Sequence, residues 1–71
     1  PEPNVEHLPV LAANLLVELV QERGLDKRWA TPLTGLELEA LSEVWPGGSV
    51  RQLRRLLEVV VCARQKMRTL H

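Results

Sequence analysis

The sequence of 71 residues contains one cysteine, Cys62, and neither phenylalanine nor tyrosine. A single cysteine excludes an internal disulfide and favours a reducing compartment, so we expect a cytoplasmic protein. No apolar run is long enough to cross a bilayer, and no secretion signal is visible. The hydrophobic residues are instead spread along the chain and are mostly leucine and valine, which favours helices packed through aliphatic side chains.

The formal net charge of the chain is zero, but the charges are segregated along the sequence. Residues 1–48 hold three cationic and eight anionic side chains, a net charge of −5, whereas residues 49–71 hold six and one, a net charge of +5. This asymmetry can indicate an anionic partner for the basic half. It can equally indicate that the two halves attract each other within the fold, and composition does not separate the two interpretations.

The sequence lacks the residue patterns of a catalytic or metal site. His7 and His71 lie far apart and Cys62 stands alone, so no cluster has metal-ligand spacing. No nucleophile is paired with a base, and the Gly-x-x-x-x-Gly-Lys-Ser/Thr loop that cradles nucleotide phosphates is missing. We therefore expect no catalysis by this chain alone.

The length predicts one domain over residues 1–71, which is marginal on its own because so small a domain buries only about 60% of its unfolded surface. Because the chain begins with Pro1 rather than methionine, we expect it to be a fragment of a longer protein. Residues 1–6 are expected to form an extended lead-in.

A first helix is predicted over residues 7–23. Pro9 falls in its first turn, where a missing N–H costs nothing, and Gly24 is a suitable terminator. Apolar residues at steps of three and four mark one buried face, namely Leu8, Leu11, Ala12, Leu15, Leu16 and Leu19. Residues 25–33 are predicted to connect this helix to the next, with a short extra turn near Trp29, whose ring covers the edge of the core.

A second helix begins after Thr34, which forms a capping box with Glu37, and ends at Pro46. Its predicted apolar face is made by Leu38, Leu41, Val44 and Trp45. The fold class is therefore all-α, a small bundle of three main helices.

The third helix is predicted from Val50 to about Met67. Its apolar residues cover about half of the circumference, which suggests a central helix contacted from two sides; they are Val50, Leu53, Leu56, Leu57, Val60, Val61, Ala63 and Met67. On the opposite face, Arg54 and Glu58 are spaced for a helical ion pair.

The segment before this helix, residues 45–49, carries the one hint of chemistry. Pro46 ends the preceding helix, and two glycines allow backbone angles that other residues avoid. Ser49 is a predicted N-cap with Gln52 as its capping-box partner. Arg51 is thereby fixed beside a helix turn with free N–H groups, where a cation can face an anion.

Three interpretations of the basic face of the third helix remain open. It can be a solvated face whose arginine stems cover apolar surface. It can bind DNA phosphates, with the second and third helices as a helix-turn-helix, although the connection is longer than usual for that motif. It can also carry a single arginine aimed at a phosphate that a neighbouring domain binds.

Two segments resemble the helical lid subdomain of the AAA+ domain in bacterial sigma-54-dependent transcription activators. Residues 7–16 read His-Leu-Pro-Val-Leu-Ala-Ala-Asn-Leu-Leu and run on to Gly24, where the family has Asp-Ile-Pro-Leu-Leu-Ala-x-x-Phe-Leu and an equally spaced glycine. The second segment is residues 34–53, where the family reads Ser-Pro-Glu-Ala-Leu, then a short helix, then Trp-Pro-Gly-Asn-Val-Arg-Glu-Leu. The sequence departs from the family pattern in three ways: His7 replaces aspartate, Gly48-Ser49 stands where the family has one asparagine, and Gln52 replaces glutamate.

The resemblance implies a sensor-II role for Arg51, which would reach the terminal phosphate of ATP. The ATP and its Mg²⁺ would be bound by a core subdomain that this chain lacks. Arg54 and Arg55 are weaker candidates for contact with that core or an adjacent subunit. The implied whole protein is an ATPase that forms a ring, remodels sigma-54 RNA polymerase and binds DNA through a separate domain. A degenerate lid that acts only in protein–protein contacts is the remaining alternative.

Overall fold

The computed structural model describes residues 5–69, and within them the chain is entirely helical apart from turns and connections. Three α-helices follow one another: α1 (Leu8–Glu22), α2 (Gly35–Val44) and α3 (Val50–Thr69). Two 3₁₀ turns, η1 (Val5–His7) and η2 (Lys27–Ala30), precede α1 and α2 respectively. The predicted all-α class with three main helices is confirmed.

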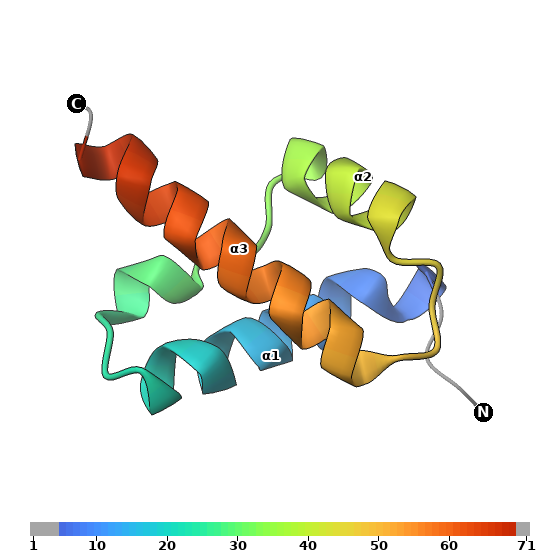
Figure 1. Cartoon of the computed structure of the whole chain (residues 1–71), viewed down its shortest axis with the longest axis horizontal. Coiled ribbons are helices and arrows are strands. Elements are labelled where there is room, and N and C mark those ends of the chain that lie inside the picture. Colours follow the sequence, from blue (N-terminus) through green and yellow to red (C-terminus); the bar gives the residue numbers. More distant parts are fainter. Residues whose placement is uncertain (1–4, 70–71) are drawn as a thin grey trace.

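Figure 1 shows α3 crossing α1 obliquely, with η2 beside the C-terminal end of α1 and α2 near its N-terminal half. The largest contact between elements is the one between α1 and α3. Helix α2 approaches α1, but its backbone comes close to α3 at few places. The molecule therefore consists of a closely packed pair of helices with a third helix attached to one side.

The start and end of α1 follow from its sequence. Pro9 lies in the first turn, as predicted, and Gly24 adopts a φ of 66° just beyond the C-cap Arg23. At that angle, which glycine tolerates best, the Leu25 N–H bonds the Val20 carbonyl at 2.9 Å. The expected extended lead-in is wrong for Val5 and Glu6, which belong to η1, whereas residues 1–4 lie outside the described part.

The core lies where α1 meets α3 and receives the C-terminal end of α2. The predicted face of α1 is buried except for Leu11, which is partly buried, and Val20, which the periodicity did not include, joins it. The buried side chains are Leu8, Ala12, Leu15, Leu16, Leu19 and Val20 of α1, Leu41 and Trp45 of the α2 segment, and Leu53, Leu57 and Val61 of α3. Trp29 is half-buried against this core, as predicted, and the Arg28 guanidinium lies over its ring, 5.3 Å from the centroid.

Two predictions about apolar faces are wrong. Val44 was expected in the core but is 56% exposed. The broad apolar arc of α3 was expected to be covered on two sides, yet Met67 is 62% exposed and Ala63 is also exposed. Both have the same cause, because α2 does not close over α3 along its length and leaves the apolar side chains between them in contact with solvent.

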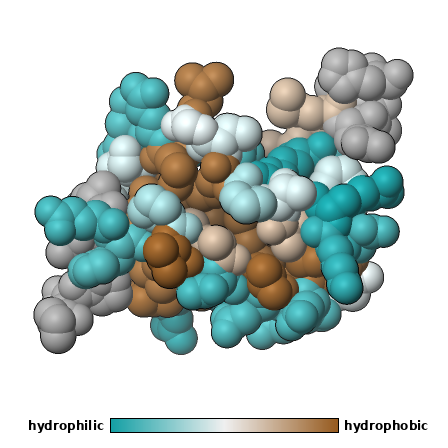
Figure 2. Space-filling model, turned by 180° about the vertical axis from the view of Figure 1, so that it is seen from behind, coloured by the Kyte–Doolittle hydropathy of each residue, from teal (hydrophilic) through white to brown (hydrophobic). Residues whose placement is uncertain are grey.

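Hydrophobic side chains also reach the surface on the opposite side of the molecule. Figure 2, the view from behind, shows apolar surface in the middle of that face and hydrophilic side chains along its lower edge and flanks. Val10 and Val17 of α1 are examples of exposed apolar residues, at 70% and 44%. None of the helices within residues 5–69 has both the length and the apolar character needed to cross a bilayer.

Leu57 offers a direct test of the core. Its side chain is fully buried on the α1-facing side of α3, so Leu57→Ala should lower the free energy of unfolding by about 2–5 kcal/mol. Denaturation with urea, followed by circular dichroism, measures this change. The control Val10→Ala, at an exposed position, should change it by less than about 0.5 kcal/mol. Equal stability of the two variants would contradict the assigned core.

Candidate functional site

The connection between α2 and α3 places Arg51 by a hydrogen bond that sequence reasoning did not find. Trp45 ends α2 with its ring fully buried, and its indole N–H donates to the Ser49 carbonyl at 2.8 Å. Gly47 and Gly48 between them have φ values of 104° and 89°, a region that favours glycine. Residues 45–49 therefore form a turn that begins at the buried Trp45 and is bonded to the indole of that residue again at Ser49.

Ser49 begins α3 as predicted. Its Oγ accepts the Gln52 N–H at 3.1 Å, and its carbonyl accepts the Leu53 N–H at 3.2 Å. The predicted capping box is only half formed, because the Ser49 N–H donates to the Gly47 carbonyl at 3.2 Å rather than to the Gln52 side chain. The backbone of the glycine turn has taken the place of the side-chain acceptor.

Arg51 therefore stands in the first turn of α3, one residue after Val50. Its side chain is exposed and makes no ion pair or hydrogen bond with residues 5–69. Because Ser49 and the turn fix the backbone here, only the side chain of Arg51 has to be ordered when it meets an anion. The geometry fits a positioned cation that takes its partner from another molecule or domain.

The two weaker candidates differ from each other. Arg54 forms an ion pair with Glu22 of α1, and Arg55 is exposed without a partner among the described residues. The predicted pair between Arg54 and Glu58 is wrong, because Glu58 pairs with Arg23 at 3.3 Å. Both ion pairs, Arg54–Glu22 and Arg23–Glu58, therefore join α3 to the C-terminal end of α1.

Each described ion pair joins the first 48 residues to the last 23. The segregated charges are therefore used at least partly within the fold, as one of the two sequence interpretations proposed. Among the α3 residues whose side chains are described, Arg51, Arg55 and Lys66 are exposed and make no ion pair with the described residues. These cations can be offered to a partner.

Arg64 of α3 donates hydrogen bonds to several other parts of the chain, and sequence reasoning gave it no role. Its Nε and Nη2 donate to the two carboxylate oxygens of Glu37 at 3.1 and 2.8 Å. Its Nη1 donates to the carbonyls of Trp29 and Thr31 at 3.2 and 2.8 Å, and Nη2 also reaches the Pro32 carbonyl at 3.3 Å. One guanidinium thus connects α3 to η2, to the following loop and to α2.

A signal for this role was present in the sequence. Arg64 follows Val60 and Val61 by four and three residues, so it lies in line with the buried stripe of α3. Only 14% of its side chain is exposed. An arginine on a core-facing stripe needs partners for its donors, and the nearest unused acceptors are loop carbonyls and a carboxylate.

Glu37 is held from both sides. Its Oε1 accepts the Thr34 N–H at 2.9 Å, and the Thr34 Oγ1 accepts the Glu37 N–H at 3.2 Å, which completes the predicted capping box of α2. The hydrogen bond from Arg64 lowers the pKa of Glu37 below its ordinary value of 4.5, more than partial burial raises it. The helix cap and the interhelical ion pair therefore share one carboxylate.

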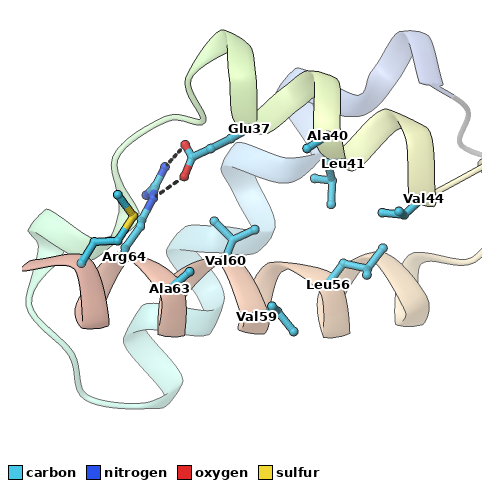
Figure 3. A pocket seen from close by; sticks show the side chains of 10 residues that line it. Glu37, Ala40, Leu41, Val44, Leu56, Val59, Val60, Ala63 and Arg64 are labelled. Atoms are coloured by element: carbon cyan, nitrogen blue, oxygen red, sulfur yellow. Dashed lines mark hydrogen bonds and ion pairs between the residues drawn. The ribbon is translucent and has the colours of Figure 1, made fainter.

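The Glu37–Arg64 pair also closes one end of an apolar groove between α2 and α3 (Figure 3). We call this feature the α2–α3 groove; its lining residues are Glu37, Ala40, Leu41, Val44, Leu56, Val59, Val60, Ala63, Arg64 and Met67. Its volume is about 410 Å³. In Figure 3 Leu41 and Val44 of α2 point toward Leu56 and Val60 of α3, whereas Val59 points away from α2.

The described residues contain no group of three or more histidine, cysteine or acidic side chains that could hold a metal ion. His71 lies outside them. The free thiol of Cys62 is exposed on α3. Comparison of the chain with models of protein families, with curated proteins and with solved structures finds no match.

The shared carboxylate predicts how stability depends on pH. Because folding lowers the pKa of Glu37 from 4.5, its ion pair contributes fully above about pH 4.5, and the contribution is lost as the pH falls through the lowered pKa. The stability difference between wild type and Glu37→Gln should therefore be largest near about pH 7 and shrink in acid. Urea denaturation from about pH 7 to 3 measures this difference.

Glu39→Gln is the matched control, since Glu39 is exposed on the same helix and makes no ion pair with the described residues. We expect it to change stability by less than about 0.5 kcal/mol across the pH range. A wild-type advantage over Glu37→Gln that stayed constant or grew in acid would rule out the assigned ion pair.

Proposed function

We propose that this chain is the helical lid of an AAA+ ATPase domain of the kind found in sigma-54-dependent transcription activators. Support comes from the order of two sequence segments, one in α1 and one running from the cap of α2 into α3. The all-α arrangement is compatible with such a lid. The single observation that carries the proposal is Arg51, a cation fixed by the turn at residues 45–49 and left without a partner in residues 5–69.

In this proposal Arg51 senses the terminal phosphate of ATP bound on a neighbouring core subdomain. The core supplies the phosphate loop and the Mg²⁺, and ATP supplies the phosphoryl group that is cleaved. The donor chemistry of Arg51 suits the task, because a guanidinium makes two parallel hydrogen bonds to a phosphate. The lid contributes this one charged contact.

Loss of the phosphate on hydrolysis removes the contact, so the lid becomes free to move relative to the core. The turn at residues 45–49 transmits that motion, since it couples the backbone of Arg51 to the buried ring of Trp45. A displacement of Arg51 is then a displacement of α3 and of the core that packs against it. In a ring of subunits, such lid movements would act on the sigma-54 polymerase complex.

The structure supports the two alternatives, DNA binding and protein contact alone, to different degrees. DNA binding by α3 is the less supported of the two, because two of its cations are engaged within the fold, Arg54 with Glu22 and Arg64 with Glu37. A lid that acts only through protein contacts is favoured by the α2–α3 groove, an uncovered apolar surface. In that case Arg51 would have no role in hydrolysis.

A substitution in the whole protein separates these functions. Arg51→Ala should lower ATP hydrolysis by at least about tenfold, since it removes a hydrogen bond to a charged group. Lys27→Ala is the control, since Lys27 is an exposed cation of η2 that makes no ion pair with the described residues, and it should keep near wild-type turnover. Both variants should melt like wild type. Normal hydrolysis by Arg51→Ala would leave the protein-contact alternative.

The gene offers an independent check. The proposal requires a Gly-x-x-x-x-Gly-Lys-Ser/Thr loop encoded about one domain's length before the codon for Pro1, because this chain contains no such loop. Its presence would place an ATP site on the same polypeptide as Arg51. A gene that encodes no nucleotide-binding core before Pro1 would exclude the lid proposal.

A further inference from the structure

The α2–α3 groove is too apolar to be an ordinary piece of surface. Val44, Val59 and Met67 are 56%, 65% and 62% exposed, although they line the same groove as the buried Leu41. Exposed apolar residues that are scattered singly need no explanation, but a contiguous set around a groove marks an interaction site. The occupant must supply apolar side chains for the groove and match the charges beside it.

Those charges have opposite signs on the two helices. Helix α2 carries Glu39 and Glu43, both exposed, on the side turned away from the core. Helix α3 carries Arg55 and Lys66, also exposed, on its own outer side. By helical spacing Glu43 adjoins the groove residue Ala40 and stands one turn after Glu39, whereas Arg55 adjoins Val59 and Lys66 adjoins Ala63. The groove therefore has an acidic lip on α2 and a basic lip on α3.

A surface with one acidic and one basic lip is complementary to itself after a twofold rotation. In a symmetric dimer the same patch is used by both subunits, so the acidic lip of one copy faces the basic lip of the other twice. A partner of one charge sign would instead be repelled by one of the two lips. The charge pattern therefore selects a second copy of this chain over a uniformly acidic or basic partner.

We propose that the α2–α3 groove is the interface of a symmetric dimer of this chain. In that dimer α3 of one copy lies antiparallel to α3 of the other and inserts Val59 into the opposite groove. Each α3 is then flanked by both α2 helices, which forms a four-helix arrangement and covers the apolar arc left open in the single chain. Glu39 and Glu43 of each copy face Arg55 and Lys66 of the other.

This proposal does not depend on the lid function. Arg51 is not a lining residue of the groove, and dimerisation is measured without nucleotide. Failure of the dimer would leave the role of Arg51 untouched, and failure of the ATPase proposal would leave the dimer untouched.

Sedimentation equilibrium of the 71-residue chain tests the interface. We expect a reversible monomer–dimer equilibrium with a dissociation constant that is roughly micromolar or weaker, because the groove is small for a permanent interface. Val59→Asp should weaken the dimer by roughly 100-fold, since it removes an apolar contact on both copies. Val10→Asp, at an equally exposed position on α1, should leave the constant within about twofold of wild type. Circular dichroism checks that both variants keep the wild-type helix content.

Exchange of the lip charges provides a second test that needs no apolar substitution. A chain with Glu39→Lys and Glu43→Lys has two basic lips, and a chain with Arg55→Glu and Lys66→Glu has two acidic lips. Each should be monomeric alone because like charges meet twice. Mixed together they should form a heterodimer, since both contacts become complementary.

The contrary results are equally definite. A wild-type chain that stays monomeric up to roughly millimolar concentration would overturn the proposal, given the range of affinities expected for such an interface. So would a dimer that Val10→Asp weakens as much as Val59→Asp does. Failure of the two charge-exchanged chains to associate would exclude this pairing of the lips.

Discussion

The attachment of α2 to the rest of the fold depends on the guanidinium of Arg64. Helices α1 and α3 pack through a continuous set of leucine and valine side chains, whereas α2 contributes few buried residues and stands apart from α3 along the groove. Arg64 spans that gap. Its guanidinium donates to the Glu37 carboxylate and to the carbonyls of Trp29, Thr31 and Pro32 in the segment before α2. Lysine could not replace it, because a single ammonium lacks the planar fork that bonds a carboxylate and carbonyls together. The N-terminal end of α2 is thus held by directed polar bonds.

The other end of α2 is fixed differently. There Trp45 is buried in the core and holds the glycine turn through the Ser49 carbonyl. Between the bonds of Arg64 at one end and the buried Trp45 at the other, α2 forms one wall of the α2–α3 groove. This construction explains how a small domain keeps both a rigid turn beneath Arg51 and an open apolar surface. Any partner that entered the groove would contact α2, the helix that Arg64 and Trp45 hold in place.

Local signals in the sequence predicted most of the fold. Pro9, Gly24 and the Thr34 capping box marked helix ends correctly, because each acts through its own backbone neighbours. Apolar spacing found the buried face of α1 but placed Val44 in the core, since periodicity says which residues share a face and not how closely another helix covers it. The ion pairs of Arg54 and Glu58 were missed for a related reason: their partners lie on α1, far away in sequence. Arg51 was singled out and lies in the expected turn. Arg64 was overlooked although its spacing placed it on the buried stripe of α3, because no sequence pattern shows that Glu37 and the loop carbonyls lie beside it.

Hydrogen exchange in the Arg64→Ala variant tests the central role of the Arg64 hydrogen bonds most directly. If Arg64 holds α2 in place, the amides of residues 38–44 should exchange much faster in the variant than in wild type, while those in the middle of α1 and α3 keep most of their protection. The apolar packing between α1 and α3 does not require Arg64, so their protection should fall only modestly. A uniform loss of protection in all three helices would contradict this picture, and so would unchanged exchange in α2.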